Sequence, residues 1–256
     1  MNCRDDYIAV FDSGVGGISV LRHLVRAMPG ERFLYFGDSA NAPYGTRSRE
    51  QVRELSFAAA ERLMPRGIKA LVVACNTATS AAVRELRAAY PDLIVVGIEP
   101  ALKPAADAFP GGGIGVMATP MTLREEKFAA LMRRYEDRCR IYKLPAPGLV
   151  EIVEAGRVDT PETEVMLREL FAPCAGDLNA VVLGCTHFPF ASHTIGRILG
   201  ERVRLFDGGM GTARQTKRRL AAAGLLAADP QTACVILENS SGLPEMIGLQ
   251  RRLLYG

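Results

Sequence analysis

The segments VVACNTATSAA (residues 72–82) and VVLGCTHFPF (residues 181–190) decide the fold class. In each, an apolar run ends in a small polar turn that carries a cysteine, Cys75 or Cys185. Continuous apolar runs are typical of buried parallel strands, and open α/β sheets bind ligands at the carboxyl ends of such strands. Two thiols presented alike therefore suggest one site with a sulfur on either side. Such a site suits removal of a proton from one face of a carbon and its return to the other face.

The chain around these segments alternates apolar strands with amphipathic helices. Strands are expected over residues 7–11, 33–36, 71–74, 93–97, 114–117, 140–144, 180–183 and 203–206. Helices are expected over residues 18–28, 49–63, 79–90, 123–135, 149–155 and 160–171, with a further helix after residue 206. This alternation predicts the α/β class, with doubly wound parallel sheets covered by helices on both faces.

The strand and turn pattern restarts near residue 111, where a second strand leads into ATPMT in place of DSG. Asp12 lies 63 positions before Cys75 and Thr119 lies 66 positions before Cys185 (75 − 12 and 185 − 119). The two halves are therefore predicted to be pseudo-twofold related domains, although doubly wound folds often look self-similar. Because DGGMGTARQTKRRL resembles the opening turn and helix, we expect residues 1–98 plus 207–256 in one domain and 99–206 in the other.

Composition narrows the class of protein. The 256 residues carry a net charge of +3, and 48% of them are hydrophobic, as in ordinary globular proteins. Arginine-rich spots such as Arg133-Arg134 read as solvated helix faces, which disfavours nucleic acid as a partner. No apolar run approaches 18 residues and no signal-peptide region opens the chain, so we expect no membrane span and a cytoplasmic protein. No C-x-x-C pair is present and histidines number three, so no metal site is expected.

The surroundings of the two cysteines favour chemistry over packing. Hydrogen-bond donors and a helix amino terminus stabilise a thiolate, and a helix is expected soon after Cys75. Cys185 is followed two residues later by His187, whose imidazole could assist ionisation or donate a proton. The alternative is that each cysteine is a small buried residue. Four further cysteines lack this context and are expected to be packing residues or surface thiols: Cys3, Cys139, Cys174 and Cys234.

Polar turns at the other expected strand ends supply donors and acids. The turn Asp12-Ser13-Gly14 could cradle an anion with its N–H groups, and a carboxylate fits it as well as a phosphate. It is neither a G-x-G-x-x-G motif nor a P-loop, and Asp12 would attract an ammonium group. Pro43-Tyr44-Gly45 offers N–H groups and a phenol hydroxyl. Thr119 and Thr122 add hydroxyls, with helix capping as the alternative.

Two acidic residues and the lysines complete the candidate groups. Glu151 and Glu154 lie near an expected helix start, where the plain interpretation is complementarity to the helix dipole. No lysine lies at a strand-end turn in a way that suggests a Schiff base, so pyridoxal phosphate is not expected. Together the turns describe a small polar pocket with donors for carboxylates, an acid for an ammonium group and two thiols. No cofactor is predicted.

The motifs resemble those of the glutamate racemase family over essentially the whole chain: FDSGVGGISVLRHL, YFGDSANAPYGTRS, VVACNTATSAA, VVGIEP, IGVMATPMT, LVEIVEAG and VVLGCTHFPF. Aspartate racemases typically have a histidine after the first cysteine motif and a glutamate after the second. Here the first of those places holds Thr79 or its neighbour Ala78, and the second holds His187. The resemblance implies a cofactor-independent enzyme that supplies D-glutamate for peptidoglycan.

The resemblance also implies roles for individual residues. Cys75 and Cys185 would serve opposite faces of Cα, with Asp12 beside the first thiol and His187 and Glu154 beside the second. The substrate's carboxylates and amine would be held by Ser13, Pro43, Tyr44, Gly45, Asn76, Thr77, Thr119, Thr122, Thr186 and His187, with Asp12. The family fold implies a site in the cleft between two α/β domains, and dimers are common in it. Few residues precede the first expected strand, so we expect little dependence on a cell-wall precursor as activator.

Two other classes of function stay open at this point. A racemase of the same superfamily could act on aspartate or another amino acid. Alternatively, the fold could serve as a binding or regulatory protein without turnover, although retention of both cysteines argues against a purely non-catalytic role. A related decarboxylase would need only one of the two thiols.

Overall fold

The computed structural model describes residues 5–228 and 233–256. Backbone contacts divide the chain into two compact units, Met1–Glu99 with Gly209–Gly256, and Pro100–Gly208. The sequence places these borders after residues 98 and 206. The second border lies later because Asp207 is the last residue of a strand that pairs with Leu183. In the described part of the chain, no helix is long and apolar enough to cross a membrane.

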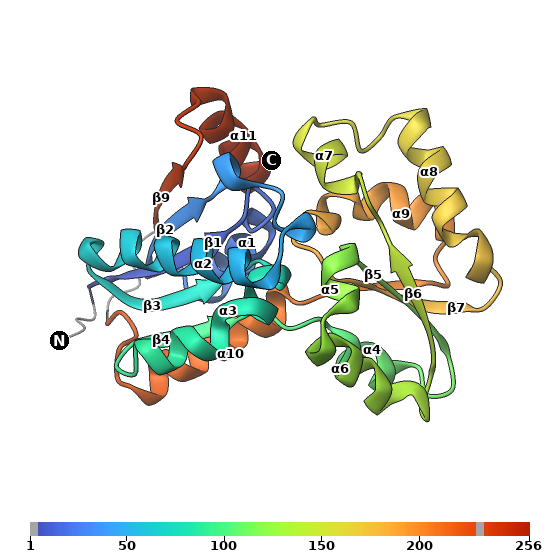
Figure 1. Cartoon of the computed structure of the whole chain (residues 1–256), viewed down its shortest axis with the longest axis horizontal. Coiled ribbons are helices and arrows are strands. Elements are labelled where there is room, and N and C mark those ends of the chain that lie inside the picture. The colour runs from blue at the N-terminus through green and yellow to red at the C-terminus, as the bar shows by residue number, and fades with distance from the viewer. Residues whose placement is uncertain (1–4, 229–232) are drawn as a thin grey trace. The chain divides into compact units, whose positions relative to one another are not determined.

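The first unit is built on a five-stranded parallel sheet with the order β4-β3-β1-β2-β9 (Figure 1). Its strands are β1 (Tyr7–Asp12), β2 (Arg32–Gly37), β3 (Ile68–Val73), β4 (Ile94–Gly97) and β9 (Cys234–Asn239). Its α-helices are α1 (Ile18–Ala27), α2 (Arg49–Leu63), α3 (Asn76–Ala89), α10 (Gly209–Ala222) and α11 (Pro244–Tyr255). Helix α2 packs against α3, and α1 packs against α10 and α11. Short 3-10 turns cover Ser39–Asn41, Tyr44–Thr46 and Met64–Arg66.

The second unit is built on a four-stranded parallel sheet with the order β6-β5-β7-β8. Its strands are β5 (Gly113–Ala118), β6 (Arg140–Pro145), β7 (Leu178–Leu183) and β8 (Arg204–Asp207). Its α-helices are α4 (Leu102–Ala108), α5 (Pro120–Arg124), α6 (Glu126–Glu136), α7 (Leu149–Glu154), α8 (Pro161–Phe171) and α9 (Ser192–Leu199). Two 3-10 turns cover Ala172–Cys174 and Phe188–Ala191. The two parallel sheets confirm the predicted α/β class.

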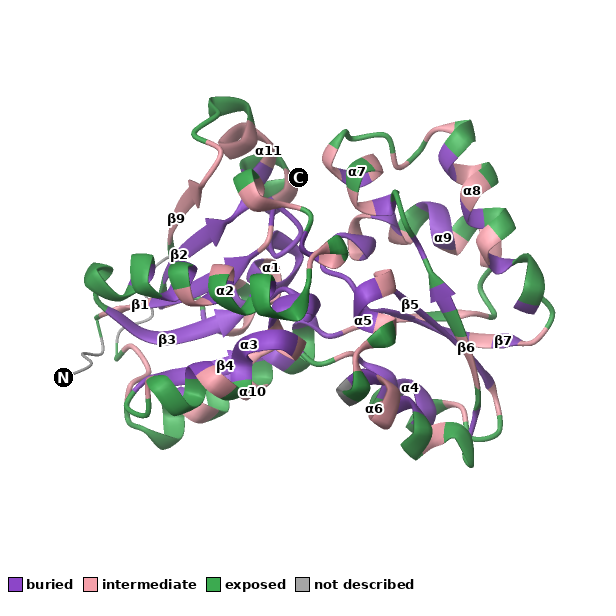
Figure 2. Cartoon of the chain, in the orientation of Figure 1, coloured by how far each residue is buried: buried purple, intermediate pink, exposed green. Residues whose placement is uncertain are grey.

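Both faces of the central strands are buried, which explains their continuous apolar sequences (Figure 2). In β7, Ala180 and Val182 belong to a core with α4 and α6. Their neighbours Val181 and Leu183 belong to a second core with α7, α8 and the 3-10 turn after β7. Because successive side chains of a strand point to opposite faces, one run of apolar residues fills both cores.

The two units repeat the same strand topology. The order β4-β3-β1-β2 in the first unit corresponds to β8-β7-β5-β6 in the second. The N–H group of Ala74, directly after β3, donates to the carbonyl of Phe11 in β1 at 2.8 Å. The N–H group of Gly184, directly after β7, donates to the carbonyl of Met117 in β5 at 2.7 Å. Each cysteine motif therefore leaves its sheet in the same register.

Some elements differ from those expected. Helix α3 begins at Asn76, three residues earlier than predicted, because the Cys75 side chain caps it. The helix expected over residues 123–135 is two helices, α5 and α6, separated by Glu125 in an extended conformation. Helices α4, α9 and α11 and strand β9 are not among the elements expected from the sequence. The run ACVILENS holds β9, and its apolar core of four residues is the signal that was available.

A buried ion pair joins two loops of the first unit to β3. The Lys69 side chain is fully buried and its Nζ lies 2.5 Å from Glu31 Oε2. Lys69 Nζ also donates to the carbonyl of Leu225 at 3.0 Å, and Glu31 Oε1 accepts from the N–H group of Ala227 at 2.8 Å. Buried charges are tolerated only when they are paired and hydrogen-bonded, as both are here.

Replacing Lys69 by methionine is expected to lower the free energy of unfolding by about 3–5 kcal/mol, because the Glu31 carboxylate is left buried without its cation. Chemical denaturation monitored by circular dichroism measures this loss. Lys103→Met is the control, since Lys103 forms an exposed pair with Asp107 and its loss should be barely measurable. Similar losses in the two variants would contradict the structural importance of the buried pair.

Candidate active site

Cys75 lies at the amino-terminal cap of α3, two residues beyond the end of β3. Its side chain is 5% exposed, and its Sγ accepts a hydrogen bond from the N–H group of Ala78 at 3.4 Å. A sulfur in this position receives both a donor and the positive end of the helix dipole. The expectation that this thiol lies at a helix amino terminus is confirmed. The arrangement stabilises a thiolate through the backbone of the helix.

Asp12 is the last residue of β1 and is completely buried. Its Oδ2 accepts a hydrogen bond from the N–H group of Gly14 at 3.1 Å. The turn packs tightly on it, since a Cβ atom on Gly17 would lie 2.6 Å from Asp12 Cβ. One N–H group of the predicted anion cradle is thus directed to the protein's own carboxylate. Ser13 follows in the same turn and is partly exposed.

The loop after β2 brings Tyr44 to the same end of the first sheet. Tyr44 is 1% exposed, its ring packs on Phe11, and its hydroxyl donates to Asp38 Oδ2 at 2.6 Å. The phenol was expected to offer its hydroxyl to a ligand, and the structure corrects this, because the proton is already donated to a buried carboxylate. Pro43 is exposed and Gly45 is partly exposed.

Asp38 is a functional candidate that the sequence analysis missed. It is 4% exposed and comes directly after the carboxyl end of β2, next to the strand β1 whose carboxyl end carries Asp12. Both of its oxygens also lie 3.1 Å from Asn41 Nδ2. The available signal was GDS following an apolar strand, the same kind of signal that drew attention to Asp12.

The environment of Tyr44 keeps its phenol protonated. Burial raises the pKa of Tyr44 far above its ordinary value of 10.0. The hydrogen bond to Asp38 raises the pKa further, as do the negative charges of Asp38, Cys75 and Asp12. The influence of Cys75 and Asp12 shows that this side chain belongs to the same polar cluster as the thiol.

Asn76 and Thr77 form the first turn of α3 directly after Cys75, and both are buried. The Oδ1 atom of Asn76 is buried and has no hydrogen-bond partner among the described residues. An unsatisfied buried amide oxygen costs free energy unless a ligand satisfies it. It offers an acceptor suited to an ammonium group or a hydroxyl.

The second unit presents Cys185 beside a histidine and a glutamate. Cys185 Sγ lies 3.8 Å from His187 Nδ1, and His187 Nε2 lies 3.0 Å from Glu154 Oε1. His187 is 3% exposed and the Glu154 side chain is 25% exposed. A carboxylate on one ring nitrogen orients the imidazole and stabilises its protonated form. The imidazole can therefore supply a positive charge or a proton to the sulfur.

The position of Glu154 corrects the interpretation based on a helix dipole. Glu154 is the last residue of α7, where the dipole disfavours a negative charge. It is held there instead by its contact with His187. Glu151 does lie in the first turn of α7, as that interpretation requires.

The threonines of the second unit have capping and buried positions. Thr119 caps α5, since its hydroxyl accepts from the N–H group of Thr122 at 3.2 Å and lies 2.9 Å from the Thr122 hydroxyl. The capping alternative is therefore confirmed for Thr119, which directly follows β5 as Ser13 directly follows β1. Thr122 is 2% exposed, and Thr186, between Cys185 and His187, is 4% exposed.

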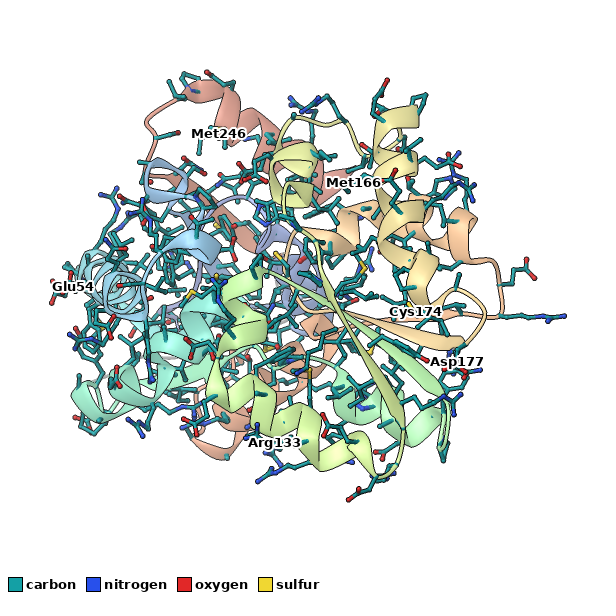
Figure 3. All side chains as sticks on the ribbon, turned by 45° about the vertical axis from the view of Figure 1, so that its right-hand side comes forward. Glu54, Arg133, Met166, Cys174, Asp177 and Met246 are labelled. Atoms are coloured by element: carbon teal, nitrogen blue, oxygen red, sulfur yellow. The ribbon has the colours of Figure 1, made fainter. Side chains whose placement is uncertain are left out.

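Two of the remaining described cysteines, Cys139 and Cys174, donate hydrogen bonds from their thiols to backbone carbonyl groups. Cys139 and Cys174 are buried in the two cores of the second unit, and Cys234 is exposed at the start of β9. Burial raises the pKa of the Cys174 thiol, and the negative charge of Asp177 adds to the effect; both residues are labelled in Figure 3. Cys3 lies outside the described residues. Within the described ranges, no group of three or more His, Cys, Asp or Glu side chains could hold a metal ion.

Comparison with known proteins places this geometry in a family. Residues 8–216 match the family described as Asp/Glu/Hydantoin racemase. A glutamate racemase of Clostridium acetobutylicum is 48% identical over 255 residues, which cover 99% of each chain. The chain belongs to the glutamate racemase family. The resemblance seen in the cysteine motifs is thereby confirmed.

Solved structures of this family agree with the fold. A glutamate racemase of Bacillus anthracis has a TM-score of 0.86 at 30% identity, covering 98% of this chain and 94% of that chain. The glutamate racemase of Francisella tularensis, solved in complex with D-glutamate, has a TM-score of 0.85 at 25% identity, covering 99% and 95%. As a member of this family the chain is a racemase, an enzyme of the isomerase class.

The raised pKa of Tyr44 predicts a loss of stability at alkaline pH. Below pH 10.0 the phenol is protonated in both the folded and the unfolded chain. Above it only the unfolded chain releases the proton, so the free energy of unfolding should fall by about 1 kcal/mol between pH 10 and pH 11 from this group. Urea denaturation across pH 8 to 11 measures the slope. Tyr44→Phe should show a shallower decline, and an equal decline would contradict the assignment.

Proposed function

We propose that this chain interconverts L- and D-glutamate, with Cys75 and Cys185 as the two acid–base groups on opposite faces of Cα. The observation that carries the proposal is the equivalence of the two thiols. Each follows its strand by two residues, and those strands pair with β1 and β5 through the same backbone hydrogen bond. The family membership supplies the reaction, and the two matched thiols supply the chemistry that it needs.

The reaction exchanges a proton between two faces of one carbon. In one direction the thiolate of one cysteine removes the proton from Cα, and the thiol of the other cysteine delivers its proton to the opposite face. The first sulfur ends as a thiol and the second as a thiolate, so the reverse direction starts from the product state. The Cα proton is a weak acid, and the proposal relies on groups already oriented toward the developing charge.

The two thiolates are stabilised by different means. Cys75 receives the N–H group of Ala78 at the amino terminus of α3. Cys185 has the His187 imidazole at 3.8 Å, and Glu154 supports the positive charge of that imidazole. We assign Glu154 as a group that acts through His187, and Asp12 as the acidic group on the side of Cys75.

The charged groups of glutamate match the polar atoms around the thiols. The Asp12 carboxylate and the unpartnered Asn76 Oδ1 atom suit the ammonium group. The carboxylates are assigned to N–H and hydroxyl donors of Ser13, Pro43-Tyr44-Gly45, Thr77, Thr119, Thr122, Thr186 and His187. For Tyr44 the assignment is to the backbone of the turn, because its hydroxyl is donated to Asp38.

The cellular setting is proposed on chemical grounds. D-Glutamate is a component of peptidoglycan, which places the enzyme before cell-wall synthesis, and a cytoplasmic location fits the free thiols of Cys139, Cys174, Cys185 and Cys234. A homodimer is proposed because dimers are common in the family. The molar mass from light scattering after gel filtration tests this proposal. Two exposed apolar residues would suit such an interface: Leu243, which precedes α11, and Tyr255, which ends it.

Serine substitutions test the two-thiol mechanism. Cys75→Ser and Cys185→Ser should each lower racemisation by about 10³-fold, since a hydroxyl is a far weaker acid than a thiol and is not ionised to act as the base. NMR in D₂O follows deuterium entering Cα, and circular dichroism of the substrate follows inversion. The matched control is Cys174→Ser, a buried thiol in the same core as Cys185, which should retain turnover.

Three outcomes separate the alternatives. Loss of racemisation in both active-site variants with a working control supports the mechanism. Wild-type protein that exchanges aspartate faster than glutamate would retain the thiol chemistry and overturn the substrate. Protein that exchanges neither amino acid would contradict racemisation and favour the binding or regulatory alternative.

Glu154→Gln tests the contact with His187. The amide keeps the size of the side chain but removes the charge that stabilises the imidazolium, so kcat should fall by about 10- to 100-fold. Glu151→Gln is the matched control on the same helix and should leave kcat unchanged. Steady-state racemisation measures both. Equal activities for the two variants would show that the imidazole works without its carboxylate partner.

A further inference from the structure

The loop between β2 and α2 is fastened by the carboxyl-terminal segment of the chain. Asn239 Nδ2 donates to Ser39 Oγ at 2.8 Å, and the N–H group of Ala40 donates to Ser240 Oγ at 2.9 Å. The N–H group of Ser240 donates in turn to the carbonyl of Gly37 at 3.0 Å. Three hydrogen bonds between segments 200 residues apart in sequence hold the start of this loop in one place.

Asp38 lies at the centre of the fastened loop and connects it to β1. Its N–H group donates to the carbonyl of Asp12 at 2.9 Å. Its carboxylate, which is almost fully buried, accepts from the Tyr44 hydroxyl at 2.6 Å and lies 3.1 Å from Asn41 Nδ2. A hydrogen bond to a buried charged acceptor is strong, so the Tyr44 side chain has one well-defined position.

The position of Tyr44 in turn determines where its backbone lies. The ring is buried against Phe11, the residue before Asp12, with ring centroids 6.2 Å apart. The side chain is therefore held at both ends, by packing of the ring and by the bond to Asp38. The N–H groups of Tyr44 and Gly45 cannot shift without breaking one of these contacts.

We propose that Asp38 is a positioning residue for substrate binding, which holds the Pro43-Tyr44-Gly45 turn in place by accepting the Tyr44 hydroxyl. This inference rests on the proposed function, in which that turn binds a glutamate carboxylate. Asp38 does not touch the substrate in this assignment. It acts through Tyr44, so its removal should weaken binding more than the proton transfers at Cα.

Asp38→Asn removes the charge of the acceptor and Tyr44→Phe removes the donor, so the two variants test the bond from either side. Each should raise KM for glutamate about tenfold, the effect expected for one hydrogen bond to a charged group, while kcat changes less than threefold. Because the two residues act through one bond, the double variant should raise KM no more than the stronger single variant. Steady-state kinetics in both directions and thermal denaturation of each variant supply the readouts.

The second unit offers a matched control. Tyr142 in β6 donates its hydroxyl to Asp177 Oδ2, a tyrosine–aspartate bond like that of Tyr44 and Asp38. Asp177, labelled in Figure 3, directly precedes β7, so it lies at the opposite end of that strand from Cys185. Asp177→Asn and Tyr142→Phe should leave KM and kcat unchanged. Ser240→Ala should raise KM less than Asp38→Asn does, while Ser241→Ala, which loses only a bond to Leu243 N–H, should have no effect.

The outcomes distinguish this inference from the proposed function. Wild-type turnover with unchanged KM in Asp38→Asn overturns the positioning role and leaves the proposed function intact. A fall in melting temperature with unchanged KM would show a purely structural role and also overturns it. Additive effects of the two substitutions would show that Asp38 does not act through Tyr44. A wild-type protein without glutamate turnover would refute the proposed function and this inference together.

Discussion

The arrangement of this protein depends on one repeated constraint, the parallel pairing of β3 with β1 and of β7 with β5. In both units the residue directly after the strand still donates its N–H group to the neighbouring strand, Ala74 to Phe11 and Gly184 to Met117. The next residue, the cysteine, is the first that is released from the sheet. In the second unit the two strands approach so closely here that a Cβ atom on Gly184 would lie 2.7 Å from the carbonyl oxygen of Met117.

The two halves stabilise negative sulfur in different ways from this common starting point. Soon after β3 the chain enters α3, so Cys75 becomes the cap of that helix and the backbone dipoles stabilise its negative charge. After β7 a 3-10 turn follows, which supplies no long helix dipole. There the charge comes from the side chains of His187 and Glu154. The first thiol is therefore stabilised by the backbone, and the second, equivalent thiol by side chains.

Sequence patterns were most informative where the local chain decides the structure. The apolar runs before Cys75 and Cys185 specify buried strands, because two covered faces leave no room for polar alternation. Thr119 could be predicted as a helix cap from its place before a proline. The helix-dipole interpretation failed for Glu154, because its place at the end of α7 is explained by its contact with His187, 33 residues away. The break at Glu125 was equally hidden, since both flanking segments favour helix.

The sequence by itself determined the α/β class, the two cysteine motifs and the family, because periodicity and motif spacing are local properties of the chain. Only the tertiary structure decided that the hydroxyl of Tyr44 is donated to Asp38 rather than to a ligand. It also decided that Asn239 and Ser240 fasten the loop around Asp38, and that Lys69 is neutralised by Glu31 in the core. These contacts join residues between 6 and 200 positions apart. Burial makes the Tyr44–Asp38 and Lys69–Glu31 contacts obligatory, and burial is a property of the folded chain rather than of any one segment.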